Sequence, residues 1–177
     1  MGFGSSPVGD VTLNTLLSRE QRERYQDSRV IQALLQEAKT VAVVGLSTEK
    51  TKASNMVASY LLDEGYQVVP VHPKATEILG QPAFPSLAAV PFPVDIVNVF
   101  RPSEEVAGIV EQAIAGGAGA IWTQLRIVDL VAAERALQAG LRVVVDRCIK
   151  MEHGRYCGAL HWAGMNTQVI SAKRPRR

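Results

Sequence analysis

The sequence has no long apolar run. None of its uninterrupted apolar segments approaches the roughly 20 residues that a helix needs to cross a bilayer. The first residues, MGFGSSPVGD, lack the charged and then apolar build of a secretion signal. We therefore expect a cytoplasmic protein without a membrane partner.

Cysteine is scarce as well. Cys148 and Cys157 are too few for a disulfide scaffold, and a reducing compartment would keep them as thiols. Together with His153 and His161 they form the pattern C-x4-H-x3-C-x3-H, which superficially resembles a set of zinc ligands. This spacing is too compact for a zinc ribbon or a zinc finger. The sequence therefore predicts no metal site.

The sequence also has little excess charge of either sign, because its formal net charge is only +2. The C-terminal tail contributes +4, which leaves −2 for the rest of the chain, through Lys173, Arg174, Arg176 and Arg177. The body of the protein is therefore not a surface for polyanions, and we expect no nucleic-acid partner. The basic tail could contact RNA or membrane phosphates, but a frayed, solubilising terminus is the favoured interpretation.

The apolar content is sufficient for one core, since 47% of the 177 residues are hydrophobic and 20% are charged. Residues 1–38 form an N-terminal arm that begins with Gly, Ser and Pro and continues into one docking helix. The main domain covers residues 39–153, and residues 154–177 form a C-terminal extension. The apolar face of the docking helix is formed by Val30, Ile31, Leu34, Leu35 and Ala38.

From residue 40 onward, short apolar strands alternate with helix-length segments. The predicted strands are VAVVG, QVVPVHP, DIVNVF, AGAIWTQ and LRVVVD. The helices begin near Ser54, Ser103 and Asp129, with Ser54 and Ser103 as helix caps. The proline-rich segment 78–93 has room for one short strand and for a helical turn near Ser86. This pattern predicts an α/β fold of the Rossmann-like, doubly wound kind, with a mainly parallel sheet and helices on both faces.

In such a sheet the ligand lies beyond the carboxyl ends of the strands. After the first strand, Gly45 is not followed by the further glycines of a dinucleotide-binding GxGxxG turn. Gly45 still permits close approach of a ligand, and Ser47 and nearby amides could bind a phosphate with help from Lys50 and Lys52. An ordinary strand-to-helix loop with solvated lysines is the competing interpretation.

The second strand ends in His72, Pro73 and Lys74, where NAD sites usually place an acid for the ribose diol. Lys74 favours a phosphate on the ribose, as in coenzyme A (CoA) or NADP, although a turn with an exposed lysine fits equally well. After the third strong strand, Phe100 and Arg101 could flank an adenine or a phosphate. The alternative for Arg101 is an ion pair with Glu104 or Glu105.

Several blocks of the sequence resemble the bacterial and archaeal CoA-binding domain proteins. These are the YccU-like group, which is related to the CoA-binding domain of succinyl-CoA synthetase alpha subunits. The resemblance runs from about residue 40 to 153 through VAVVGLS, GYQVVPVHPKATEILGQPAFPSL, PVDIVNVFR, AIWTQL and VVVDRCIKMEH. It implies a cytoplasmic Rossmann-like domain that binds CoA or an acyl-CoA noncovalently. The residues that it implies for this site are Gly45, Leu46, Ser47, Lys52, Ser54, His72, Pro73, Lys74, Phe100, Arg101 and Gln124.

The sequence departs from this family at two positions. Many relatives have Asn where this chain has His72, and Gly where it has Arg126. His72 can still form hydrogen bonds, whereas Arg126 leaves the inner half of the site open to two interpretations: crowding of the thiol-bearing arm or another phosphate contact.

We find no set of catalytic residues in the sequence. The glycine-rich phosphohistidine loop of a CoA ligase is absent, and His161 lies in the unrelated segment ALHWAGM. We therefore expect noncatalytic binding of CoA, in the role of a carrier, sensor or regulator. The alternatives are an NADP-dependent oxidoreductase and a protein-interaction module with a vestigial crevice. The oligomeric state stays open between a monomer and a homodimer.

Overall fold

A computed structural model describes residues 15–158 of the chain. Residues 1–14 of the predicted arm and residues 159–177, which include His161 and the basic tail, lie outside the described residues. None of the helices within residues 15–158 is long and apolar enough to cross a membrane.

The centre of the fold is a five-stranded parallel sheet with the strand order β2-β1-β5-β6-β7. The chain adds β2 on one side of β1 and then continues with β5 on the other side, so the direction of winding reverses between β1 and β5. This order confirms the predicted doubly wound α/β fold. The strands are β1 (Thr40–Val44), β2 (Gln67–Val71), β5 (Ile96–Val99), β6 (Ala120–Thr123) and β7 (Arg142–Val144).

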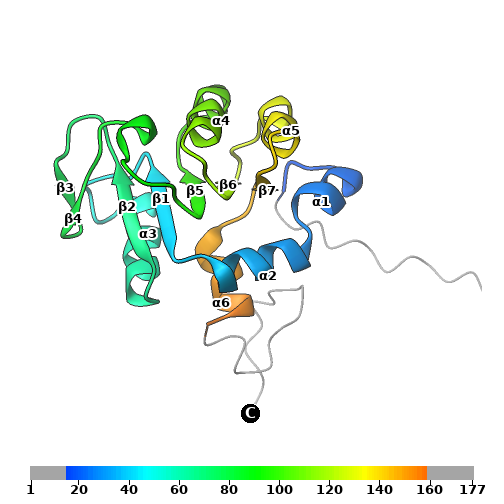
Figure 1. The fold of residues 1–177 in the computed structure, drawn as a ribbon. Coiled ribbons are helices and arrows are strands. Elements are labelled where there is room, and N and C mark those ends of the chain that lie inside the picture. Colours follow the sequence, from blue (N-terminus) through cyan, green and yellow to red (C-terminus); the bar gives the residue numbers. More distant parts are fainter. Residues whose placement is uncertain (1–14, 159–177) are drawn as a thin grey trace, which may run out of the picture.

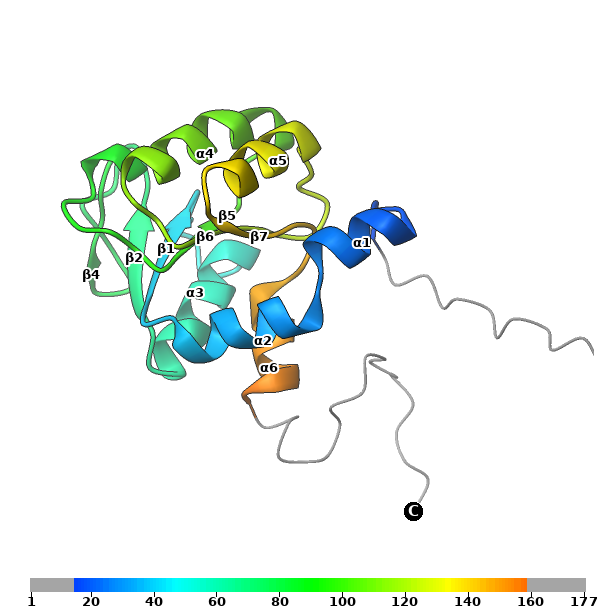
Figure 2. The same cartoon turned by 45° about the vertical axis from the view of Figure 1, so that its right-hand side comes forward.

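Helices cover both faces of the sheet (Figures 1 and 2). One face packs against α4 (Val106–Ala115) and α5 (Leu130–Gln138), and the other against α2 (Ser28–Glu37), α3 (Ala53–Asp63) and α6 (Ile149–Tyr156). Successive strand residues point to opposite faces, so each strand contributes to both cores and reads as an apolar run. The largest fully buried side chain is Trp122 of β6, on the α2, α3 and α6 side.

The arm contains a helix that the sequence did not predict, α1 (Arg19–Tyr25). Its segment REQRERY is almost entirely charged or polar and buries only Tyr25, so it has no apolar periodicity. A capping box stabilises it instead, in which the Ser18 side chain accepts from the Gln21 backbone and the Gln21 side chain accepts from the Ser18 backbone. Val145 donates a backbone hydrogen bond to the Tyr25 carbonyl at 3.2 Å, which joins the arm to the end of β7.

Two predicted helix caps are wrong. The N-cap of α3 is Lys52, and the Ser54 hydroxyl instead accepts a hydrogen bond from the Ser47 backbone at 3.0 Å. Ser103 begins a 3-10 turn (Ser103–Glu105), its hydroxyl accepts from the Val128 backbone at 2.9 Å, and α4 begins only at Val106. In both cases a tertiary partner in a neighbouring loop engages the hydroxyl that the sequence assigned to a local cap.

The proline-rich connector contains slightly more structure than predicted. It forms a small antiparallel pair, β3 (Glu77–Ile78) and β4 (Gln81–Pro82), followed by the predicted helical turn (Leu87–Ala89) after Ser86. The helix predicted from Asp129 is also present, because the Asp129 side chain caps α5 by accepting from Ala132. At the other end of the domain, the predicted boundary at 153 lies inside α6, which continues to Tyr156.

Candidate functional site

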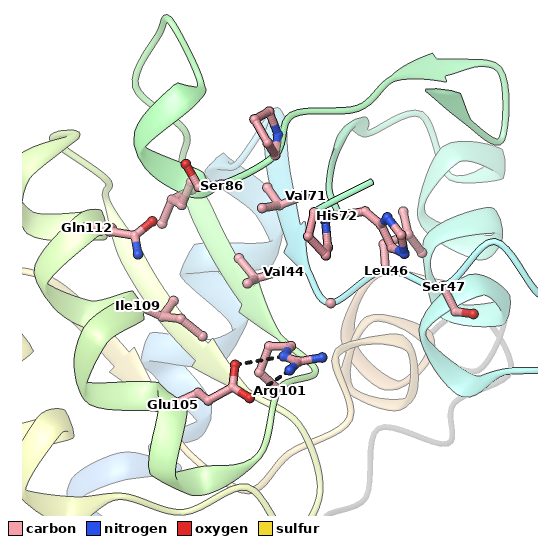
Figure 3. Close-up of a pocket in the computed structure, with 14 residues that line it drawn as sticks. Val44, Leu46, Ser47, Val71, His72, Ser86, Arg101, Glu105, Ile109 and Gln112 are labelled. Carbon is pink, nitrogen blue, oxygen red and sulfur yellow. Dashed lines mark hydrogen bonds and ion pairs between the residues drawn. The ribbon is translucent and has the colours of Figure 1, made fainter. Parts of the chain in front are cut away.

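A cleft of about 500 Å³ lies where the winding of the sheet reverses. Its walls come from the carboxyl ends of β1 and β2, the loop after β5, the 3-10 turn after Ser86 and the first part of α4 (Figure 3). The carboxyl ends of strands at such a reversal are the usual ligand site of doubly wound folds. Among the residues predicted from the sequence, those that line the cleft are Gly45, Leu46, Ser47, His72, Pro73 and Arg101.

Gly45 forms the sharp turn at the end of β1. Its φ of +85° is in the left-handed region, and its N–H donates to the Val71 carbonyl at 3.1 Å. A Cβ atom at this position would lie 2.7 Å from Cδ of Arg101. Glycine is therefore required both by the backbone conformation and by the close passage of the Arg101 side chain.

The loop between Gly45 and α3 is held by side chains from the helix itself. Asn55 donates from Nδ2 to the Ser47 carbonyl at 2.8 Å, and the Ser54 hydroxyl accepts from the Ser47 N–H. Lys52, the N-cap residue, makes no side-chain capping bond. An anion at this end of α3 would meet uncapped backbone N–H groups and the positive end of the helix dipole.

His72 stabilises the turn after β2. Its Nδ1 accepts hydrogen bonds from the backbone N–H groups of Lys74 (3.1 Å) and Ala75 (2.9 Å), so the ring must carry its proton on Nε2 when neutral. The imidazole thereby holds Pro73 at the rim of the cleft. Lys74 is exposed beside this turn and does not line the cleft.

Arg101 reaches the cleft as one partner of an ion pair. Its Nε donates to Oε2 of Glu105 at 2.8 Å and its terminal nitrogen donates to Oε1 at 2.7 Å (Figure 3). These hydrogen bonds raise the pKa of Arg101 and lower the pKa of Glu105. The ion pair that the sequence offered as the alternative for Arg101 is thus confirmed, with Glu105 as the partner, and it lies on the wall of the cleft.

The sequence did not assign an apolar half to the site. Val44, Val71, Leu87 and Ile109 form this part of the wall, and Gln112 fixes it by accepting a hydrogen bond from the Ala88 backbone at 3.2 Å. The connector returns across the strand ends through backbone hydrogen bonds between Phe84 and β2, and no residue pattern in the sequence signals this path.

The remaining predicted residues lie outside the lining of this cleft, and ligand contact by them stays a prediction. Phe100 is partly buried against the core on the α3 side of the sheet. Gln124 is only 4% exposed and donates from Nε2 to Oδ1 of Asn98 at 2.7 Å. Lys52 is exposed and lies 3.9 Å from a carboxylate oxygen of Glu49. Lys74 and Ser54 have the positions described above.

A second polar cluster joins α6 to α3, on the face of the sheet opposite α4 and α5. His153 is buried, and its Nδ1 is 2.9 Å from the Tyr60 hydroxyl. Burial lowers the pKa of His153, raises the pKa of Tyr60 to about 12, and raises the pKa of the Cys157 thiol. Within residues 15–158, no three His, Cys, Asp or Glu side chains are grouped closely enough to hold a metal, and His161 lies outside this range.

The fold and the cleft define a doubly wound α/β protein with a cleft at the reversal of its sheet. The family model described as the CoA binding domain matches residues 39–154. The chain is also 40% identical over 123 residues to the uncharacterized protein YneT of Bacillus subtilis, covering 70% of this chain and 91% of that one. The chain therefore belongs to the CoA-binding domain family, as its resemblance predicted.

Two solved structures and one further sequence relative are also similar to this chain. A hypothetical protein from Pyrococcus horikoshii OT3 is 37% identical with a TM-score of 0.71, covering 74% of this chain and 92% of that chain. A Thermus thermophilus protein is 34% identical with a TM-score of 0.70, covering 73% and 98%. An ADP-forming acetate–CoA ligase of Archaeoglobus fulgidus is 36% identical over 74 residues, which are 42% of this chain and 11% of the ligase.

Proposed function

We propose that the cleft binds CoA or an acyl-CoA without transforming it, and that the protein is a carrier, sensor or regulator in the cytoplasm. The main support for this proposal is that the residues that line the cleft all lie within the part of the chain that matches the CoA binding domain. This match covers residues 39–154.

The two halves of the cleft suit the two kinds of surface on CoA. The Ser47 hydroxyl offers a hydrogen-bond donor to a phosphate, and Arg101 offers positive charge. The apolar wall of Val44, Val71 and Ile109 offers a surface to the adenine or to the pantetheine arm. Pro73, which lines the cleft and is held by the His72 turn, offers an apolar contact for the adenosine.

The absence of catalysis is part of the proposal, and it is supported by how the polar groups at the cleft are occupied. His72 Nδ1 already accepts two backbone hydrogen bonds, and Glu105 is bound to Arg101 through both carboxylate oxygens. Neither group is therefore poised to take a proton from a bound thioester. These contacts are suited to holding a ligand in place.

Thermal unfolding in the presence of CoA, acetyl-CoA, dephospho-CoA, NAD and NADP tests this function. A ligand at 100 times its dissociation constant stabilises the folded state by about 2.7 kcal/mol, which is visible as a shift of the melting temperature. We expect the largest shift with CoA or acetyl-CoA. Lys74→Ala should reduce the difference between the melting-temperature shifts produced by CoA and by dephospho-CoA. Lys39 is an exposed lysine next to the opposite end of β1, and Lys39→Ala should leave this difference unchanged.

Other outcomes point to the other functions that the sequence left open. A larger shift with NADP, together with hydride transfer from NADPH to carbonyl compounds, would establish an oxidoreductase. Flat calorimetric titrations with every thioester, and no CoA in the purified protein by mass spectrometry, would contradict CoA binding and favour an interaction module.

A further inference from the structure

Arg101 presents to the cleft the group by which arginine recognises phosphate, but this group is already occupied. Its Nε and one terminal nitrogen form the edge that binds a carboxylate or a phosphate through two parallel hydrogen bonds. In the structure both of these bonds go to Glu105, at 2.8 and 2.7 Å. The carboxylate of Glu105 therefore stands where two oxygens of a ligand phosphate would bind (Figure 3).

Both partners of this pair are partly exposed. The aliphatic part of Arg101 passes close to Gly45. The side chain of Arg101 is 47% exposed, and that of Glu105, at the end of the 3-10 turn (Ser103–Glu105), is 43% exposed. A partly exposed ion pair of this kind contributes little stability. Rotation of the Glu105 side chain into solvent can therefore release Arg101 at small cost.

We infer that Glu105 is a specificity-determining residue that competes with the phosphates of the ligand for Arg101. Every anion that binds Arg101 must displace Glu105, so a ligand with a single carboxylate only replaces one carboxylate with another and gains nothing. A ligand whose other groups are also held by the cleft can offset this cost. Glu105 thereby lowers the affinity for every anion that uses Arg101 and excludes those that have no further contacts. This inference rests on the proposed binding of CoA in the cleft.

The chain contains a matched control in the same turn. Glu104 precedes Glu105 and is also exposed, but it does not line the cleft. Glu104→Gln removes the same charge from the same turn and leaves the Arg101 pair intact. Any difference between Glu105→Gln and Glu104→Gln therefore reports the direct competition and not the general field of the turn.

Calorimetric titration of CoA into the full chain at constant ionic strength tests the inference. We expect Glu105→Gln to lower the dissociation constant by about two- to fivefold, the range given by the strength of an exposed ion pair. Glu104→Gln should leave it within error of the unchanged protein. Arg101→Gln should weaken binding, and adding Glu105→Gln to Arg101→Gln should produce no gain, because the competitor acts only through Arg101.

The results separate this inference from the proposed function. If the unchanged protein binds CoA but Glu105→Gln binds no tighter, or if Glu104→Gln produces the same gain, the competition is wrong and CoA binding stands. If neither the unchanged protein nor Glu105→Gln binds CoA, both fail. A gain that persists in the double variant also contradicts competition through Arg101.

Discussion

Cδ of Arg101 lies only 2.7 Å from where a Cβ atom of Gly45 would be, and Cγ of Arg101 lies 3.2 Å from the same point. The turn at Gly45 after β1 and the side chain of Arg101 after β5 therefore pack directly against each other. This contact places the guanidinium at the mouth of the cleft, and it depends on the absence of a side chain at position 45.

Gly45→Ala should therefore impair both folding and ligand binding. The left-handed conformation alone costs a residue with a Cβ atom about 1–2 kcal/mol. The displaced Arg101 side chain should add about 1 kcal/mol and weaken CoA binding. The measurement is urea unfolding together with CoA titration. Gly140→Ala is the matched control, because Gly140 has φ of +90° with nothing within 4 Å of its Cβ position. An equal loss of stability in both variants, with CoA affinity unchanged, would contradict the role of this contact.

The backbone conformation at Arg126 predicts that glycine is tolerated better than alanine at this position. Arg126 has φ of +65°, a left-handed conformation that favours glycine. We expect the free energy of unfolding in urea to be about 1 kcal/mol higher for Arg126→Gly than for Arg126→Ala, because only glycine is free of the strain. A stability order with alanine above glycine would show that Arg126 is not strained.

The sequence predicted the architecture well because its strands are buried on both faces. Ile96 and Val97 point to opposite faces of β5 and meet different cores, so the strand reads as an apolar run. The same reasoning missed α1, whose only buried residue is Tyr25. A helix of this kind is stabilised by its cap and by contacts distant in sequence, such as the Arg24–Glu134 ion pair at 2.6 Å, and hydrophobic periodicity cannot reveal it.

The cleft was predictable only in its polar half. Gly45, Ser47, His72 and Arg101 follow strand ends, and parallel strands bring such residues to one edge of the sheet. Glu105 was considered only as the partner of Arg101, since the sequence does not show that the pair faces a cleft. The apolar wall, including Leu87, depends on the path of the connector across the strand ends. That path is determined by tertiary packing and has no local signal.

Asp146 should be important for holding the arm on the domain. Its carboxylate accepts from the Thr15 hydroxyl at 2.7 Å and from the Leu16 N–H at 2.8 Å, and its other oxygen accepts from the Arg126 N–H at 2.6 Å. Asp146→Ala would leave these donors without their acceptor, and we expect a loss of about 1–3 kcal/mol in urea unfolding.

Asp146→Asn is the control for this prediction. Asparagine tolerates the left-handed backbone, φ of +58°, and keeps one acceptor oxygen, so it should lose less stability than alanine. Equal losses in the two variants would mean that the acceptor oxygen kept by asparagine contributes nothing, which would contradict the role of the hydrogen bonds to Thr15, Leu16 and Arg126.

His153 predicts how the stability of the protein depends on pH. Burial lowers the pKa of His153 in the folded protein below its ordinary value of 6.5, and the neutral ring can accept the Tyr60 hydroxyl at Nδ1. The unfolded chain therefore binds more protons than the folded protein between these two pKa values. The contribution of His153 is complete above pH 6.5 and is lost as the pH falls below it.

Neighbouring groups also titrate, so the contribution of His153 must be isolated. Glu152 has a pKa raised by burial, which gives the opposite slope above its ordinary value of 4.5, and Glu64 favours the charged form of His153. The measurement is the free energy of unfolding between pH 5 and pH 8, compared with His153→Gln, whose side-chain oxygen can accept the Tyr60 hydroxyl but does not titrate. As the pH falls through about 6.5, the free energy of unfolding of the native protein should decrease relative to that of His153→Gln. If the difference in the free energy of unfolding is constant across this range, His153 has the same pKa in the folded and unfolded states. The α6 cluster then does not require the neutral form of His153.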